Sequence, residues 1–130
     1  MHRSTLFCLS FFAIFSVSAV AHEPAVNPLL QIELGDLANQ EGLMVEVNLP
    51  PGEDGVPHRH NAHTFVYVLS GTVNMQVKGG ELKTLNAGDT FYETPQDIHT
   101  VGSNVSKTLP AKLLVFFVKK QGEPATVLVE

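Results

Sequence analysis

Cysteine and positive charge are both scarce in this chain. Cys8 is the only cysteine among 130 residues, which excludes an intrachain disulfide. The fold must therefore be held by its core, by a bound metal or by association with other chains. Eight Lys and Arg residues stand against 13 Asp and Glu, and no basic run occurs. Nucleic acid and anionic membrane surfaces are consequently poor candidate partners.

Long apolar runs are lacking except at the N-terminus. Arg3 precedes an apolar stretch over residues 6–17, and Ala19-Val20-Ala21 has the small-x-small pattern of a signal-peptidase site. The stretch is too short for a permanent membrane span, although an uncleaved anchor is the alternative. We expect residues 1–21 to be a signal peptide removed after Ala21. The remaining 109 residues would then be periplasmic or secreted, without stable membrane insertion.

Helix signals are nearly absent from the rest of the chain, while strand signals recur at short spacing. From Leu43 to Leu49, apolar residues alternate with Glu46 and Asn48, which is typical of a strand with one buried face. Many short strands separated by Gly and Pro predict one all-β domain, an antiparallel closed sandwich or barrel. We assign residues 22–41 to a lead-in and first strand, with a loosely held start at 22–28, and residues 42–130 to the barrel. The other expected strands cover residues 64–70, 72–78, 81–85, 90–93, 98–101, 111–118 and 125–129.

Three histidines form the main candidate site. His58 and His60 are two residues apart at the opening of a strand, so both imidazoles can point to the same face. His99 begins another short strand, and pairing of the two strands would bring its ring to the same point. Three convergent imidazoles suit a divalent first-row metal. Taken alone, a His-x-His pair in a loop is equally compatible with no metal at all.

The surroundings of these histidines resemble the two signatures of the cupin superfamily. Gly52 is followed by five residues and then by His58-Arg59-His60, as in the first signature. The segment from Gly88 to Asn104, with His99 inside it, resembles the second signature, although Pro95 and Asn104 each come one residue late. The resemblance covers residues 52–104. It implies a small single-domain jelly-roll barrel of the RmlC-like type, with a metal held inside by His58, His60 and His99.

One position departs from the family pattern. Thr64 stands where the first cupin signature usually has a glutamate, and a hydroxyl is a weak ligand compared with a carboxylate. Three readings stay open: an open three-histidine site, entry of His63 as a fourth ligand through a bulge, or a barrel without metal. Glu93 is a further possible metal ligand or a group behind the ligands, but we favour a solvated charge at the end of a strand.

A three-histidine site keeps the full charge of its metal, so it attracts anionic oxygen ligands and acts as a strong Lewis acid. Among cupins, such centres occur in thiol and diketone dioxygenases. The resemblance therefore implies a metal-dependent enzyme that carries out a dioxygenase-type oxidation of a small oxygen-bearing molecule, and the predicted signal peptide adds that it is exported. Its cofactor would be one iron, manganese, nickel, copper or zinc ion. The alternative is a non-catalytic barrel that binds a small molecule or a metal.

The expected oligomer is a homodimer. The segment Ala111–Val118 is apolar on both faces, as in a strand buried between layers or in a subunit interface. Phe65, Tyr67 and Leu69 share one strand face and should pack between layers or between subunits as well. Because cupins commonly dimerise, the resemblance supports pairing of two copies.

Overall fold

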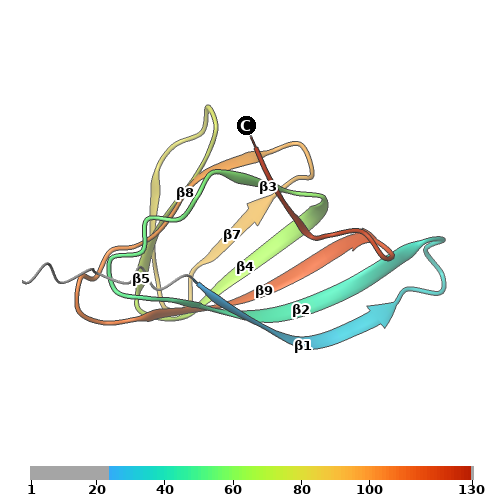
Figure 1. Cartoon of the computed structure of the whole chain (residues 1–130), viewed down its shortest axis with the longest axis horizontal. Helices are drawn as coiled ribbons and strands as arrows, with labels where there is room; N and C mark the ends of the chain where they lie inside the picture. Colours follow the sequence, from blue (N-terminus) through green and yellow to red (C-terminus); the bar gives the residue numbers. More distant parts are fainter. Residues whose placement is uncertain (1–23, 130) are drawn as a thin grey trace, which may run out of the picture.

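The computed structural model describes residues 24–129, which form ten strands in two antiparallel sheets (Figure 1). The predicted all-β antiparallel jelly-roll fold is confirmed, although the hydrogen-bond ladders of the described residues divide into two facing sheets and not one closed cylinder. Each of the eight expected strands is present, with ends that differ by a few residues. The predicted signal peptide lies outside the described residues. Among the residues that are described, no helix is long and apolar enough to cross a membrane.

The two sheets contain five strands each. In order across the first sheet lie β1 (Ala25–Glu33), β2 (Gln40–Leu49), β9 (Ala111–Lys120), β4 (Ala62–Ser70) and β7 (Thr90–Glu93). In order across the second sheet lie β10 (Thr126–Leu128), β3 (His58–His60), β8 (Ile98–Asn104), β5 (Thr72–Val77) and β6 (Lys83–Asn86). The C-terminal strand therefore ends beside β3, far from it in sequence (Figure 1).

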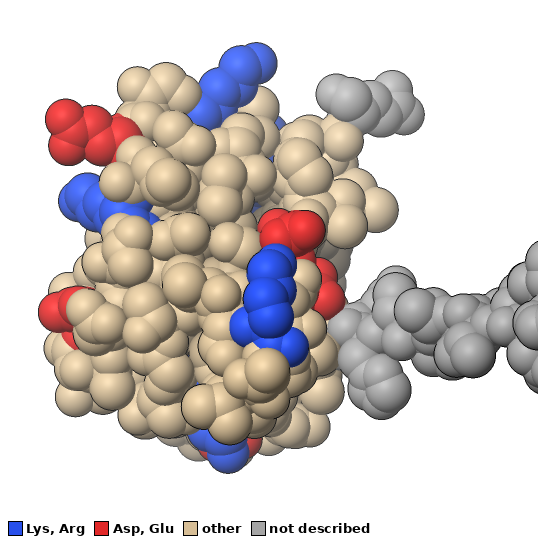
Figure 2. Space-filling view, turned by 90° about the vertical axis from the view of Figure 1, so that its left-hand side faces the viewer, with Lys and Arg blue, Asp and Glu red and all other residues tan. Residues whose placement is uncertain are grey.

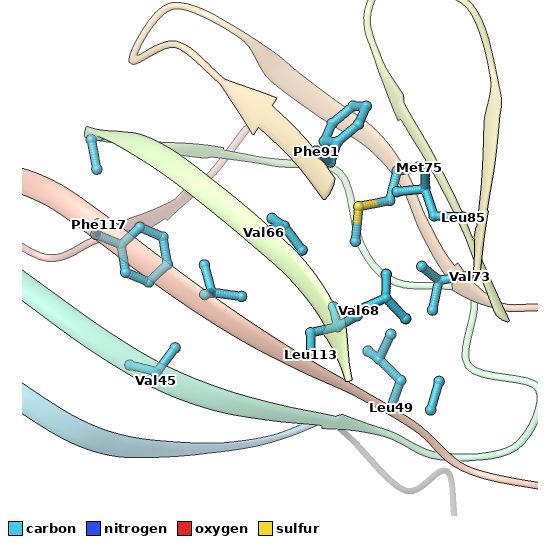
Figure 3. Close-up of a cluster of buried hydrophobic side chains, with 13 residues drawn as sticks. Val45, Leu49, Val66, Val68, Val73, Met75, Leu85, Phe91, Leu113 and Phe117 are labelled. Carbon is cyan, nitrogen blue, oxygen red and sulfur yellow. The ribbon is translucent and has the colours of Figure 1, made fainter. Parts of the chain in front are cut away.

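The core lies between the two sheets and is built from alternate residues of their strands (Figure 3). Val68 from the first sheet and Val73 from the second are each 0% exposed. The central strand β9 buries Leu113, Val115 and Phe117 on its inner side. Because side chains alternate along a strand, the opposite face of the first sheet points outward, away from this core. Burial of the inner faces is the main favourable contribution to folding.

The first strand predicted within residues 22–41 is present as β1. It begins at Ala25, inside the stretch 22–28 that we expected to be loosely held. β1 pairs with β2 at the edge of the first sheet, and the register shifts between Pro28 and Leu30. An edge position with a bulge tolerates a proline, which cannot donate to a ladder. This is why a proline-bearing segment can be a strand here.

Charged side chains are spread out on the face shown in Figure 2. Blue Lys and Arg side chains lie scattered there among tan residues, several of them close to red Asp or Glu side chains. On that face, neither sign forms a continuous patch. The expectations of no nucleic-acid partner and no stable membrane insertion stay predictions.

The side chain of Asn104 connects three chain segments. Asn104 is the last residue of β8, at the end of that strand away from its pairing with β3. Its side chain is 2% exposed, and its Nδ2 group donates to the carbonyl oxygens of Leu49, Pro50 and Leu109 at 2.8–3.2 Å. Its Oδ1 atom accepts a hydrogen bond from the Ser106 backbone N–H at 3.0 Å. The second cupin-like signature thus ends in a structural residue, which satisfies buried backbone groups.

We predict that Asn104→Ala lowers the free energy of unfolding by about 2–3 kcal/mol, because it leaves buried backbone groups without partners. Urea unfolding followed by circular dichroism measures the change. Asn74→Ala is the matched control, since Asn74 makes only an exposed hydrogen bond with Thr84. Equal stability of the two variants would contradict the structural role of Asn104.

Candidate metal centre

The second sheet brings the three histidines together. β3 pairs with β8 so that His58 lies directly opposite His99, and His60 lies two residues along the same strand. One ring nitrogen from each residue falls within 4.8 Å of the others. The expected pairing of the two strands is therefore observed. It gathers three imidazoles at one place between the sheets.

Hydrogen bonds hold the rings of His58 and His60 from behind. The Nδ1–H group of His58 donates to the Val56 carbonyl oxygen at 2.7 Å. His60 Nδ1 lies 3.1 Å from Thr126 Oγ1 and 3.3 Å from the Ala125 carbonyl oxygen. Because a carbonyl oxygen can only accept a hydrogen bond, the second contact favours a proton on Nδ1. Outer-shell contacts of this kind fix the tautomer of a metal-binding histidine.

With both protons on Nδ1, the two Nε2 atoms carry lone pairs and face each other at 3.2 Å. Two acceptors at this distance repel unless something positive lies between or beside them. A shared cation removes that repulsion, so this pair of atoms fits a metal ion.

His99 is buried and is short of hydrogen-bond partners. The residue is 7% exposed, and neither ring nitrogen makes a hydrogen bond of good geometry with a described residue. Gly102 packs against the ring, since a Cβ there would lie only 3.0 Å from His99 Cε1. Buried polar atoms are normally paired, so an imidazole held in place without partners is a suitable metal donor.

The protonation states suit metal binding as well. Burial, followed by the neighbouring His58 and His99 rings, lowers the pKa of His60 to about 4. Burial, followed by the charge of His58, lowers the pKa of His99 to about 4. At neutral pH both rings are therefore neutral and keep the lone pair that a metal ligand needs.

The structure corrects the interpretation of Glu93. We expected a solvated charge at a strand end, but Glu93 is only 1% exposed and points between the sheets. Its Oε1 atom lies 3.5 Å from His99 Nδ1, and its Oε2 atom lies 3.9 Å from His60 Nε2. Burial, followed by the negative charge of Asp97, raises the pKa of Glu93 to about 7. The carboxyl group thus belongs to the histidine cluster.

Thr64 and His63 lie on opposite faces of β4, as alternation requires. Thr64 is 0% exposed and lies directly opposite Glu93 of β7. His63 is exposed on the outer face, where its Nδ1 atom hydrogen-bonds the Tyr92 hydroxyl at 2.7 Å. The bulge that would bring His63 inside is not found there, because the register of β4 against β9 shifts only between Val68 and Ser70.

Two residues that contact His60 could not be predicted from the sequence around the histidine motif. Thr126 supports His60 because β10 pairs with β3, 66 residues away along the chain. The Phe117 ring lies beside His60, with their centroids 5.1 Å apart. The apolar pattern of β9 predicted that strand, but pattern alone does not show which of its residues reaches the site.

The comparison with protein families identifies the class. The model of the Cupin domain family matches residues 45–117, and the chain belongs to this family. The predicted resemblance to cupins is therefore confirmed. The match includes all three histidines, Thr64 and Glu93. No curated protein matches the chain.

Solved structures support the same fold. An uncharacterized conserved protein with a double-stranded beta-helix domain from Klebsiella pneumoniae is 24% identical, with a TM-score of 0.63, over 90% of this chain and 96% of that one. The DMSP lyase DddQ from Ruegeria pomeroyi is 23% identical, with a TM-score of 0.58, over 68% of this chain and 43% of that one. This chain therefore spans less than half of the length of that lyase.

A third similar structure is an oxalate oxidase in complex with the substrate analogue glycolate. It is 25% identical, with a TM-score of 0.57, and the match covers 82% of this chain and 55% of that one. Like the lyase, it is a longer protein than this chain.

We predict that alanine at His58, His60 or His99 weakens divalent metal binding by about tenfold or more, since even outer-shell partners contribute about 10–100-fold. Titration of metal-free protein with Zn²⁺ in a calorimeter gives the affinity. His63→Ala is the matched control and should bind as the parent does, because His63 faces outward. Metal loss in the control equal to that in His99→Ala would overturn the three-histidine assignment.

Proposed function

We propose that this chain is an exported cupin that binds one divalent first-row metal through His58, His60 and His99. We further propose that it oxidises a small carboxylate-bearing molecule with O₂ as the oxidant, either by dioxygenase-type insertion of both oxygen atoms or with two-electron reduction of O₂ to H₂O₂. The observation that carries the proposal is the pair of Nε2 atoms that face each other at 3.2 Å beside a buried, unpartnered His99. A redox-active ion at this place supplies an electrophilic centre that can exchange electrons.

The protein's own residues hold and shield that centre. Val56 and Thr126 orient the two imidazoles of β3 through their Nδ1 atoms. Aromatic rings close the surroundings, because Phe117 lies 5.1 Å from His60 and Phe91 lies 6.2 Å from His99 between ring centroids. An apolar wall lowers the local dielectric and strengthens the attraction of the ion for an anionic ligand.

The substrate class follows from charge and is supported by similarity. Neutral imidazoles leave a divalent ion with its positive charge, which favours a bidentate anionic oxygen ligand such as a hydroxy acid. The oxalate oxidase with a similar fold is in complex with glycolate, a ligand of this kind. The alternative is a barrel that binds a metal or a small molecule without turnover.

We predict that the full chain, expressed without a histidine tag, carries about one equivalent of a redox-active metal and consumes O₂ with glycolate or oxalate. Elemental analysis and an oxygen electrode measure the two quantities. His99→Ala is the control and should lose both the metal and the oxygen uptake.

Two other outcomes would each overturn one part of the proposal. Saturable glycolate binding without oxygen uptake would overturn the enzymatic half and support the binding barrel. A folded protein that takes up no divalent metal would overturn the metal centre itself.

Export is part of the proposal, supported by the apolar N-terminal pattern that ends at Ala21. We predict that the chain, expressed whole in a Gram-negative host, appears in the periplasmic or culture fraction with an intact mass that begins at His22. Replacing Ala19 and Ala21 by bulky residues should block cleavage. A full-length mass in the cytoplasmic fraction, with or without these changes, would contradict export.

The homodimer also stays a proposal, and the outer face of the first sheet is where it would form. Phe65, Tyr67 and Tyr92 are each more than 40% exposed there, and Leu114 and Phe116 line the same hollow. Phe65 and Tyr67 point outward and do not pack between the two layers of one chain. Their exposure supports the proposed pairing of two copies through this face.

A further inference from the structure

The burial of Glu93 has no explanation within the fold alone. The residue is 1% exposed, and no described residue donates a hydrogen bond to its Oε2 atom. Lys119, the buried lysine of β9, is already paired with Glu41. A carboxyl group buried in this way stays ionised only with a positive partner beside it. A cation beside Glu93 would supply the missing partner.

The carboxylate lies on the metal-facing side of His60. His60 directs its Nδ1 atom towards Thr126, so its Nε2 atom is the one available to a metal. Glu93 Oε2 lies 3.9 Å from that same Nε2 atom. Glu93 Oε1 could instead accept a hydrogen bond from His99 Nδ1. The two atoms are 3.5 Å apart, however, and no hydrogen bond forms between them.

The residue opposite Glu93 makes room for it. Thr64 on β4 and Glu93 on β7 are direct partners in the antiparallel ladder, and both point inward. Opposite residues have Cβ atoms about 4.5–5.5 Å apart, so two glutamates there would repel each other. Thr64 is small and neutral, and it occupies the position at which the cupin signature has its acid. The pair therefore still contains one carboxylate, on the other strand.

We propose that Glu93 is the fourth protein ligand of the metal centre and supplies from β7 the carboxylate that the family signature places on β4. This inference rests on the metal centre proposed above and adds a member to it. A carboxylate ligand lowers the net charge of the centre from two to one, so the centre still attracts an anionic oxygen ligand, but less strongly than three imidazoles alone would make it. It also favours harder ions such as Mn²⁺, because oxygen donors suit them better than imidazoles do.

The test compares metal affinity in metal-free protein, with Mn²⁺ followed by electron paramagnetic resonance and Zn²⁺ by calorimetry. Glu93→Gln should weaken Mn²⁺ binding by about 100-fold or more, the upper end of what an outer-shell partner contributes. The loss of Zn²⁺ affinity should be smaller. Glu46→Gln, the same change on the outer side of β2, is the control and should leave both affinities unchanged.

An exchange of the two opposed residues separates a ligand from an orienting group. Glu93→Thr should lose Mn²⁺ as Glu93→Gln does, and the double variant Thr64→Glu/Glu93→Thr should regain it to within about tenfold of the parent. An outer-shell or purely structural role would not be restored by an acid on another strand. If Glu93→Gln does not fold, the double variant carries the test alone, judged by its Mn²⁺ affinity against the parent.

The outcomes distinguish this inference from the proposed function. Metal loss in His99→Ala, with unchanged Mn²⁺ affinity in Glu93→Gln, would overturn the role of Glu93 and keep the three-histidine centre. A folded double variant that binds Mn²⁺ no better than Glu93→Thr would overturn it as well. Unchanged metal affinity in His99→Ala and in Glu93→Gln would overturn both proposals.

Discussion

Four ionisable side chains share a small space between two apolar sheets, and the interior can hold them only if their charges and lone pairs are matched. With their protons on Nδ1, His58 and His60 present lone pairs to each other at 3.2 Å, while His99 and Glu93 Oε2 lack hydrogen-bond partners among the described residues. Polar groups buried without partners oppose folding. A single divalent ion would compensate all four groups at once. Metal binding would then contribute directly to the stability of this barrel.

Strand pairing creates this arrangement from residues that are far apart along the chain. The register of β3 with β8 sets His58 opposite His99, and the register of β4 with β7 sets Thr64 opposite Glu93. β10 pairs with β3 at the edge of the second sheet, and its Thr126 side chain orients His60. A slip of one residue in either register would turn one of these side chains to the outer face. The site therefore depends on the same ladders that hold the fold.

Much of the fold was predictable, because it follows from local chemistry. Alternation of apolar and polar residues predicted the strands, and Gly and Pro marked their ends. The His-x-His spacing and the similarity to the cupin signatures predicted which three histidines gather. The start of β1 was harder to predict, because Pro28 argues against a strand at that point unless its position at a sheet edge is known.

Glu93 was misjudged for a different reason. Its burial is set by the ladder between β4 and β7, and nothing in the residues around it shows that Thr64 would be its partner. Alternation along β7 allows Glu93 to share a face with the buried Phe91, but the pattern in four residues is too short to decide which face is inside. The support of His60 by Thr126 depends likewise on a non-local pairing. Residues that complete a site from other strands are the part that a single sequence does not reveal.

The central claim is that one metal ion is held by three imidazoles and the carboxylate of Glu93. The most direct measurement is a crystal structure of the metal-loaded protein with anomalous diffraction at the absorption edge of the bound metal. The account predicts one anomalous peak at about 2.0–2.2 Å from a nitrogen of His58, His60 and His99 and from an oxygen of Glu93. A peak elsewhere, or one coordinated by the histidines with Glu93 turned away from it, would contradict the account.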